Sequence, residues 1–547
     1  MRRATAHLKG IGPSWRHRYP GWRQKSVQPK LDQKIKLLFY PHQTKNMRIM
    51  TSEQFKQAIE LDPTWAVNLN EPVKITDYCD MAGSGIANLS PQLHFTGRNE
   101  EGDSADFSGC TNLKVAEGSF AGRVSFSRTG VAKIGDLHIS SPSTDGMAAI
   151  FSGCENLRVA EGKFPGFVIF SDSGVVRIGD LHISSPKADG IAAFFCDCQR
   201  LKVAEGTFPG GVWFCGSGIE RIGELVISRP DNVGIAADFG SCKGLKTAEG
   251  TFPGSVSFRN SGIKEIGNLI IQSPNKRGEA ANFDDCQSLE VAEGIFPGSV
   301  SFDHSGIARI GKLTTASDSE GVAAYFDECE NLEVAEGSFP GLVTFRNSGI
   351  SRIGELVIDS PNKAGIAALF DHCNNLIVAR GTFPGSVSFR SSGIKQIGDL
   401  HVTSRDCDGN AAYFDECENL EVAKGIYHGC VNFSGSGVEK IGDIHITACS
   451  ENGNAASFFD CPDLKVAEGI FPGFVDFSAS GIKTVGNLVI LNPNTQGMKS
   501  DFTGCNNLRL KAEYLGPEFG MDDSARQKNL ERIATAEAQR LQPEIEI

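Results

Sequence analysis

The sequence predicts a mainly β solenoid, a stack of about twenty similar turns with a short helical cap at each end. Three observations support this fold class. A motif F-x-x-C-x-x-L recurs every 44 residues, with one interval of 43. A second motif, S-G-(I/V)-x-x-I-G, lies between successive copies of the first. The chain has 62 Gly and 35 Phe but only 7 Tyr, which indicates many turns and aromatic rings meant for burial.

The first motif carries one cysteine in each copy, and the second carries one serine. The cysteines are Cys110, Cys154, Cys198, Cys242, Cys286, Cys329, Cys373, Cys417, Cys461 and Cys505. The serines are Ser173, Ser217, Ser261, Ser305, Ser348, Ser392, Ser436 and Ser480. Overlaying "FSGCENLRVAEG" on "FSDSGVVRIGDL" matches Phe151 with Phe170, Val159 with Ile178 and Ala160 with Gly179. Each 44-residue unit is therefore expected to hold two turns, of 19 and 25 residues.

Alternating apolar and polar residues predict one strand per turn. We expect Leu157 and Val159 to point inward and Arg158 to point outward. Pro and Gly in "FPG" (164–166) and "SSPKADG" (184–190) predict the bends between strands. One turn cannot bury its own apolar edge, whereas stacked turns can. About twenty turns at ~4.8 Å each predict a rod on the order of 100 Å long.

The sequence pattern of "CENLRVA" and "SGVVRIGDL", followed by "AAFF", resembles the bacterial surface-antigen (BspA-like) class of leucine-rich repeats. The resemblance covers residues 107–505. It implies a leucine-rich-repeat-like right-handed solenoid, and it implies binding rather than catalysis. The chain departs from the class in two ways. It alternates Cys and Ser, where the class repeats a cysteine every ~23 residues, and it lacks the Ile-Pro pair after the strand. The partners of the class therefore do not transfer.

The N-terminal end departs from the repeat. Residues 1–50 carry 12 Lys and Arg against the single acid Asp32, and we expect this basic segment to be disordered or, up to residue 46, untranslated. "TSEQ" at 51–54 predicts a capping box that opens a short helix through Leu61. Residues 51–106 then form an N-terminal cap.

The C-terminal end is expected to close the stack with a helix. Repeats continue through residues 107–505, and residues 506–547 are predicted to be a C-terminal cap. Asp523 and Ser524 predict the start of its helix. Leu530, Ile533 and Leu541 lie roughly on one helix face, which we expect to cover the last open turn.

The repeat cysteines are predicted to be structural. Successive copies lie two turns, or about 10 Å, apart, whereas a disulfide needs Cα atoms within ~7 Å and zinc needs closer thiolates still. We therefore expect small buried thiols beside the Phe rings. Cys196 and Cys215 differ, because they follow Phe195 and Phe214 on adjacent turns, about 5 Å apart. They are candidates for a redox pair or half of a metal site. No third ligand is evident, and we expect no metal and no cofactor.

Histidines and carboxylates give no catalytic pattern. His138, His182, His401 and His445 occupy a position that holds Val or Ile in other repeats, which indicates packing or surface. The acids of Asp327/Glu328 and Asp415/Glu416 recur at many turns, so a solvated face is favoured over a glycosidase or lyase site. No phosphate-binding loop or nucleophile motif is present. We therefore predict no catalytic residues and no small-molecule substrate.

A column of basic residues recurs seven residues after the motif Phe on seven consecutive turns. Its members, named the basic column, are Lys114, Lys133, Arg158, Arg177, Lys202, Arg221 and Lys246. Three residues further on lies the acidic column, Glu117, Asp136, Glu161, Asp180, Glu205, Glu224 and Glu249. Stacked like charges repel, so one interpretation is that the two ladders pair and offset each other. The other is that the basic column binds an acidic partner.

An apolar patch is predicted on one stretch of the solenoid. In the segment F-P-G-x-V-x-F the two x positions usually hold serine, as in Ser255 and Ser257. Phe167, Ile169 and Trp213 replace them in two adjacent repeats. Exposed, these residues form a binding site with Trp as its anchor. The alternative is that the turn folds over them and buries them.

Composition limits the class of function. Hydrophobic residues make up 40% of the chain, and no run approaches the ~18 apolar residues of a membrane span. No apolar core of a signal peptide follows the initial Met-Arg-Arg. We therefore expect a cytoplasmic protein with reduced cysteines. Delivery outside the cell by a non-classical route is the alternative.

The sequence predicts a non-enzymatic repeat scaffold that binds another protein along the solenoid. The first alternative is binding of nucleic acid or an anionic surface through residues 1–50 and the basic column. A carbohydrate-active enzyme built on the solenoid is a further alternative. It would require one non-repeating polar cluster, which the sequence does not show.

Overall fold

A computed structural model describes residues 47–540. The chain divides into two units, Met1–Arg48 and Ile49–Ile547, and nearly all of the first lies outside the described residues. The predictions for residues 1–46 and for Leu541 therefore concern parts of the chain that are not described.

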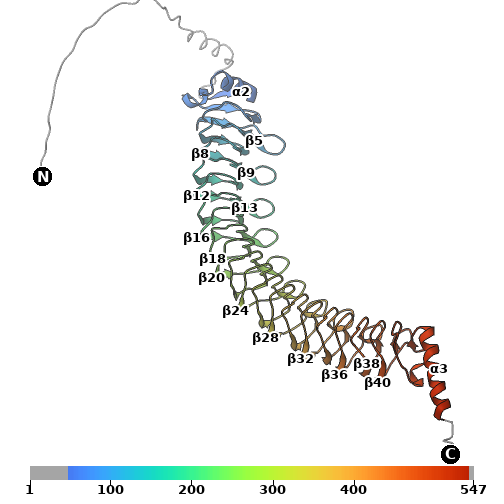
Figure 1. Cartoon of the computed structure of the whole chain (residues 1–547). Helices are drawn as coiled ribbons and strands as arrows, with labels where there is room; N and C mark the ends of the chain where they lie inside the picture. The colour runs from blue at the N-terminus through green and yellow to red at the C-terminus, as the bar shows by residue number, and fades with distance from the viewer. Residues whose placement is uncertain (1–46, 541–547) are drawn as a thin grey trace, which may run out of the picture. The chain divides into compact units, whose positions relative to one another are not determined.

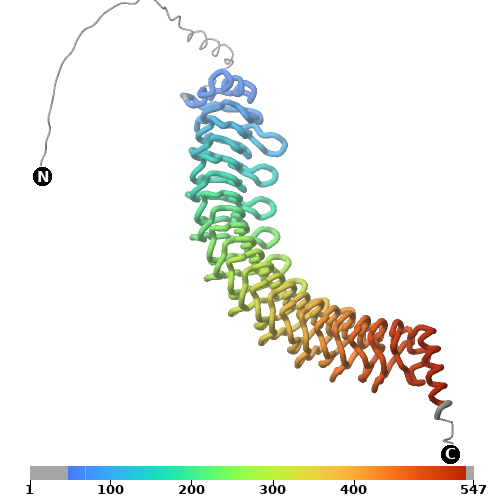
Figure 2. The backbone as a smooth tube through the Cα atoms, in the orientation of Figure 1, coloured from blue at the N-terminus to red at the C-terminus, as the bar shows by residue number. Residues whose placement is uncertain are grey.

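The unit Ile49–Ile547 is a right-handed β-solenoid of about 24 turns with a short helix near each end. Figures 1 and 2 show the turns stacked one after another in sequence order. The prediction of a mainly β solenoid is confirmed. The turns exceed the predicted twenty because residues of both caps also coil into turns of the stack.

The first side of the solenoid is a continuous parallel sheet, named the long sheet, in which each strand pairs with the next along the axis. Its strands are β3 (Cys79–Asp80), β5 (Asp103–Asp106), β7 (Arg123–Ser125), β9 (Met147–Ile150), β11 (Phe167–Ile169), β13 (Ile191–Phe194), β15 (Gly211–Trp213), β17 (Ile235–Asp238), β19 (Ser255–Ser257), β21 (Glu279–Asn282), β23 (Ser299–Ser301), β25 (Val322–Tyr325), β27 (Leu342–Thr344), β29 (Ile366–Leu369), β31 (Ser386–Ser388), β33 (Asn410–Tyr413), β35 (Cys430–Asn432), β37 (Asn454–Ser457), β39 (Phe474–Asp476), β41 (Ser500–Asp501) and β42 (Phe519–Gly520).

The second side, named the outer face, is made mostly of parallel strand pairs, one pair per 44-residue unit. Its strands are β1 (Arg48–Met50), β2 (Val73–Ile75), β4 (Leu93–Phe95), β6 (Val115–Phe120), β8 (Lys133–Ile139), β10 (Val159–Phe164), β12 (Arg177–Ile183), β14 (Val203–Phe208), β16 (Arg221–Ile227), β18 (Thr247–Phe252), β20 (Glu265–Ile271), β22 (Val291–Ile295), β24 (Arg309–Thr314), β26 (Val334–Phe339), β28 (Arg352–Ile358), β30 (Val378–Phe383), β32 (Gln396–Val402), β34 (Val422–Tyr427), β36 (Lys440–Ile446), β38 (Val466–Phe471) and β40 (Thr484–Ile490).

The motif phenylalanines form one stack through the core. Phe151 and Phe170 have ring centroids 5.3 Å apart and nearly parallel planes, and Phe170 stacks in the same way on Phe195 at 5.1 Å. These rings are fully buried. Stacked aromatic rings supply much of the apolar area that a thin solenoid must bury, so one Phe per turn holds adjacent turns in register.

The register between the two turns of a unit differs by one residue from the sequence overlay. Val159 pairs with Arg177, and Ala160 pairs with Ile178. The cysteine turn holds one more residue than the overlay assumes, because a second tight turn closes where the Leu157 N–H donates to the Cys154 carbonyl at 3.0 Å. In the serine turn Gly174 lies against that bend, where a Cβ would clash with the Glu155 carbonyl oxygen, so glycine is required.

The predicted strand alternation is wrong at one position. Leu157 is buried and Arg158 is exposed, as expected, but Val159 is only half-buried and Ala160 faces the core. The strand begins at Val159, after the tight turn, so the alternation cannot be counted through Leu157. An irregularity between Ala160 and Gly162 then returns Phe164 to the core.

The N-terminal helix has the predicted capping box. Helix α2 (Ser52–Leu61) begins after Thr51, whose hydroxyl accepts from the Gln54 N–H at 3.3 Å. The Gln54 side chain accepts in return from the Thr51 N–H at 3.0 Å. The helix buries Phe55 and Ile59 against the first turns. Local sequence therefore suffices to set this helix start.

The C-terminal helix begins where predicted but contacts the stack differently. Helix α3 (Asp523–Arg540) leaves Leu530 47% exposed. The contact is made by Asn529, which accepts from the Leu510 N–H at 2.9 Å and donates to the Leu508 carbonyl at 3.1 Å. The prediction that Leu530 covers the last turn is wrong. An open strand edge presents N–H and C=O groups, which an amide satisfies and a leucine does not.

Candidate interaction surfaces

The predicted apolar patch is only partly exposed. Phe167 is 1% exposed, so its proposed role as an exposed contact is wrong. Ile169 and Trp213 are half-buried on the outward side of the long sheet. Ile169 and Trp213 follow the central valine of their strands, whereas Phe167 occupies the position before it. In other repeats it is equally buried, as at Ser299.

The outward side carries a longer apolar line than the sequence suggested. Cross-strand pairing joins Ile150 to Ile169, Ile169 to Phe194, and Phe194 to Trp213. These four residues, named the aromatic strip, come from four successive turns, and each is half-buried. Ile150 and Phe194 were missed because they follow "AA" rather than "FPG". Each lies directly before the Phe of a cysteine turn. Strand alternation predicts that this position faces outward, so comparing it across the repeats would have found them.

Ring contacts hold the aromatic strip in one arrangement. The Phe194 ring meets the Phe167 ring edge-on at 4.8 Å and the Trp213 ring edge-on at 5.6 Å. Gly211 makes room for the indole, because a Cβ there would lie 2.9 Å from a ring carbon of Trp213. Phe167 therefore acts as a buried support beneath the exposed edges of Phe194 and Trp213.

A disulfide joins the two turns that carry the aromatic residues. Cys196 and Cys215 are bonded, with Cα atoms 4.6 Å apart. Each cysteine lies two residues beyond a ring of the aromatic strip, Phe194 and Trp213 respectively. Of the two possibilities left open for these cysteines, a redox pair or half of a metal site, the structure contains the bonded pair. The cross-link fixes neighbouring turns where the rings project, which restrains the strip without adding a binding group.

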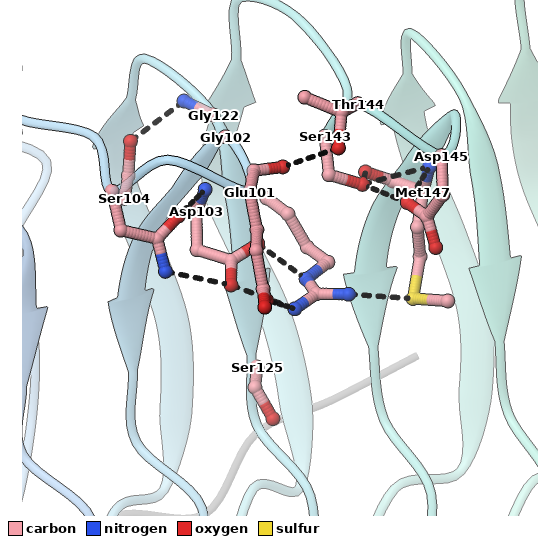
Figure 3. Close-up of polar contacts among 12 residues, drawn as sticks. Glu101, Gly102, Asp103, Ser104, Gly122, Ser125, Ser143, Thr144, Asp145 and Met147 are labelled. Carbon is pink, nitrogen blue, oxygen red and sulfur yellow. Dashed lines mark hydrogen bonds and ion pairs between the residues drawn. The ribbon is translucent and has the colours of Figure 1, made fainter.

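An ion pair marks the N-terminal limit of the apolar line. Arg123 contacts Asp103 at 2.6 Å and Glu101 at 3.8 Å, and it donates to the Met147 sulfur at 3.7 Å. Figure 3 shows the labelled carboxylates Glu101 and Asp103 on the side of this cluster away from Met147. The outward surface changes here from charged to apolar, and Met147 stands at the boundary.

A polar recess adjoins the aromatic strip at the corner of the same turns. It has a volume of about 1050 Å³. Its lining is small and polar, including Ser127, Arg128, Ser152 and Asp172. Ser152 lies two residues from Ile150 of the strip, so an apolar line and a hydrophilic hollow share one edge.

The seven basic-column residues are all exposed, as a binding face requires. Several of these side chains nevertheless form hydrogen bonds or ion pairs with neighbouring groups of the same chain. Arg158 donates to the Glu155 carbonyl at 2.6 Å, Lys246 donates to the Lys243 carbonyl at 2.9 Å, and Lys202 pairs with Glu220 at 2.9 Å. Arg158 and Lys246 therefore satisfy backbone carbonyl oxygens at the tight bend of their cysteine turns, whereas Lys202 pairs with a carboxylate.

The two charged columns do not form contacting ion pairs within residues 47–540. They interact at longer range. Burial raises the pKa of Glu117 above its usual range and Asp136 raises it further, whereas Lys133 lowers it. Lys133 therefore opposes, without outweighing, the burial and the Asp136 charge that raise the pKa of Glu117.

The four predicted surface histidines, His138, His182, His401 and His445, are exposed. The paired carboxylates behave differently from one another. Glu328 is exposed, as expected, but Asp327 is half-buried and pairs with Arg346 at 2.8 Å. Asp415 likewise pairs with Arg390 at 3.1 Å. The solvated-face prediction therefore holds for the glutamates and fails for the aspartates, which begin the corner turn beside the buried Phe.

Three carboxylates crowd one corner of the solenoid. Asp284, Asp303 and Asp327 line a small hollow of about 240 Å³ on successive turns. Burial, together with the charges of Asp327 and Asp284, raises the pKa of Asp303 to about 7. The Asp303 carboxylate accepts from the Asp327 N–H at 2.9 Å. Burial and the like charges of its neighbours therefore disfavour the ionised form of Asp303.

The repeat cysteines are buried free thiols, as predicted. Burial raises the pKa of Cys242 and of Cys417 to about 11, and hydrogen bonds from Ser217 and Ser392 only partly oppose it. Within residues 47–540, no set of three or more His, Cys, Asp or Glu side chains is arranged to hold a metal ion. No helix of that part of the chain has the length and apolar character to cross a membrane.

Comparison with models of known protein families, with curated proteins and with solved structures found no match. The function is therefore inferred from the surfaces of this chain.

Proposed function

We propose that this protein is a non-enzymatic scaffold that binds another protein, with the aromatic strip as its main contact. One observation carries the proposal. Four successive turns place apolar side chains on an outward position that holds Ser125 before the strip and Asp238 after it. A half-exposed apolar line bordered by polar residues is typical of an interface, and tryptophan is a frequent anchor.

The supports beneath the strip favour binding. Phe167 backs the rings, and the Cys196–Cys215 disulfide joins the turns that carry Phe194 and Trp213. A side chain already held in place loses little conformational entropy when a partner covers it. The strip therefore resembles a rigid contact rather than an adaptable one.

A protein partner suits this surface better than a small molecule. Small-molecule sites are concave and mostly apolar. Here the apolar line lies on the side of a sheet, and the neighbouring recess is lined by Ser, Thr, Gly and charged side chains. A protein can cover both at once, with apolar side chains on Trp213 and polar groups in the recess. The resemblance to BspA-like leucine-rich repeats also favours binding.

Nucleic acid or an anionic surface is the alternative partner, bound through the basic column and residues 1–50. Exposure of the basic column favours it, and its engagement with backbone carbonyls opposes it. Salt separates the two. Phosphate binding falls steeply as salt rises, whereas an apolar protein contact does not.

The test replaces two strip residues with the serine found at the same position of β19 and β23. A partner recovered with the wild-type full-length chain is titrated against Ile169→Ser with Trp213→Ser. We expect binding at least about tenfold weaker, or ~1.4 kcal/mol, and a melting temperature within a few degrees of wild type. Phe167→Ser is the contrasting variant, because it removes a buried support and should lower the melting temperature. Unchanged affinity in the double variant would contradict the proposal.

A further inference from the structure

The outer-face strands, such as β8, β12 and β16, lie on the other side of the stack from long-sheet strands such as β9 and β13 (Figure 1). A second apolar line lies on this outer face. Five successive strands of this face each place one uncharged side chain at the same outward position. These residues, named the aliphatic column, are Thr207 in β14, Val226 in β16, Thr251 in β18, Ile270 in β20 and Ile295 in β22. Cross-strand pairing joins Thr207 to Val226 and Thr251 to Ile270. Val226 is 54% exposed, Ile270 47% and Ile295 74%. These side chains are far more open than the half-buried Trp213.

Packing does not require aliphatic residues at this position. The same position holds Ser119, His138, Lys163 and His182 in earlier turns, and His401 later. The core is filled by the neighbours in sequence, such as Ile227 and Ile271, which are buried. β-Branched residues suit strands, but the serine, lysine and histidine turns show that the fold forms without them. The position stays uncharged on the next four turns, at Thr314, Ser338, Val357 and Thr382. The stretch from Val226 to Ile295 differs because three of its four successive turns carry an exposed aliphatic side chain, which points to a contact.

Acidic residues accompany the aliphatic column. Its five strands carry five glutamates against one basic residue, Arg221: Glu205, Glu224, Glu249, Glu265 and Glu293. Each glutamate is exposed or half-exposed. The net charge of residues 51–547 has the same sign, with 65 acidic and 41 basic residues, or −24, and the basic-column residues Lys202 and Lys246 lie just before β14 and β18 rather than within the strands. This field attracts cationic segments and repels phosphate and anionic lipid.

We propose that the aliphatic column and its five glutamates form a second docking surface, for a basic polypeptide segment in which Lys or Arg alternates with apolar side chains. The apolar side chains of the partner cover Val226, Ile270 and Ile295, and its cations face the glutamates. Charge complementarity selects this occupant over a nucleic acid, which the glutamates repel. The surface lies across the core from the aromatic strip, so both can be occupied at the same time.

The test uses defined peptides with the full-length chain. A short fluorescent peptide alternating Lys with Val is titrated by anisotropy, beside a Lys/Ser peptide and a Glu/Val peptide of equal length. We expect the Lys/Val peptide to bind at least about tenfold more tightly than the other two, or ~1.4 kcal/mol. Ile270→Ser with Ile295→Ser should lose this advantage. The fold should tolerate both changes, because Ser119 and Ser338 occupy the same position.

Two further variants separate the contributions. Glu249→Gln with Glu293→Gln should weaken binding and flatten its salt dependence, since two of the flanking charges are removed. Ile169→Ser with Trp213→Ser should leave peptide binding unchanged, so failure of this surface and failure of the aromatic strip give different results.

Location is checked by cross-linking. A photo-reactive residue at position 251 should cross-link the Lys/Val peptide, and one at the equivalent exposed position 401 should not. The proposal is overturned if the Lys/Ser peptide binds as tightly as the Lys/Val peptide, if Ile270→Ser with Ile295→Ser changes nothing, or if RNA or anionic vesicles compete for position 251.

Discussion

The thiol of Cys286 donates a hydrogen bond to the Phe258 carbonyl oxygen of the preceding turn, 3.1 Å away. The Ser261 hydroxyl lies 3.4 Å from the same sulfur. Every repeat cysteine makes the equivalent thiol–carbonyl bond, at 3.0 or 3.1 Å. The recurring cysteine thus has a structural explanation, since one small buried group fills the core and links two turns.

Replacing Cys286 tests this explanation. Cys286→Ser keeps a donor but shortens the side chain, so we expect a loss of about 1 kcal/mol in the free energy of unfolding. Cys286→Asp buries a charge and should cost several kcal/mol. Denaturant unfolding measures both. Equal stability of the Asp and Ser variants would show that the site is not the closed apolar space described here.

Thiol labelling should follow burial. At neutral pH the raised pKa values of the repeat cysteines leave almost no thiolate to react. Cys407 is the exposed free cysteine among residues 47–540, and it should react first. Mass spectrometry of the native and unfolded chain checks the order. Rapid labelling of the whole cysteine column in the native chain would contradict the fold.

The Cys196–Cys215 disulfide should stabilise its own turns. It closes a loop of 19 residues, for which chain entropy predicts about 3 kcal/mol. Cys196→Ser with Cys215→Ser should therefore speed hydrogen exchange in β13 and β15, while distant turns such as β31 keep their protection. Alkylation before and after reduction shows whether the bond forms. Two free thiols in the native chain would remove the restraint assumed for the aromatic strip.

Asp303 should make stability depend on pH. Its pKa rises from 3.8 in an ordinary carboxyl to about 7 in the folded chain. A raised folded-state pKa contributes stability that is present below the unfolded value and is lost as pH rises through the folded value. The contribution of Asp303 is therefore fully present below about pH 4 and is lost by about pH 7. The facing charged groups are Asp284, Asp285, Asp327, Glu328, His304, Arg259 and Arg346.

Asp303→Asn provides the measurement. Asparagine keeps an acceptor for the Asp327 N–H and carries no charge, so we expect the melting temperature near pH 8 to rise by a few degrees. The gain should disappear near about pH 4. Asp359→Asn, at an exposed carboxylate, is the control and should change little. A variant that is destabilised at both pH values would show that the carboxylate is needed for packing.

Small-angle scattering tests the stacking of turns. A compact particle of 547 residues would have a radius of gyration of roughly 24 Å. About 24 turns placed one after another require a clearly larger value. A radius near the compact estimate would contradict the solenoid.

The period and the burial of the motif Phe, Leu and Cys residues could be predicted from the sequence because the motif repeats at fixed intervals. The 44-residue spacing, one Phe per turn, the capping box at Thr51 and the separation of Cys196 from Cys215 all follow from counting residues along the chain. Repeated turns can bury a Phe, a Leu and a Cys only by stacking, so the solenoid was implied by the repeat itself.

Register and exposure depended on tertiary contacts. The extra residue of the cysteine turn shifted the pairing of Val159 to Arg177, because a tight bend absorbs a residue without changing the motif spacing. Phe167 and Trp213 occupy the positions before and after the central valine of the same segment, and in the stack the first is buried whereas the second is half-buried and faces outward. Asn529, not Leu530, meets the open end, since the edge presents backbone groups.

The sequence by itself determined that this chain coils into stacked β turns with buried phenylalanines and thiols, because those features repeat at fixed intervals. Only the tertiary structure decided which outward residues form continuous lines. Ile150 and Phe194 are 44 residues apart, and Val226 and Ile295 are 69 residues apart, yet parallel stacking places each pair on one face, two and three turns apart respectively. A surface is formed by several turns together. Which residues make up its apolar and charged parts is therefore known only when the register between those turns is known.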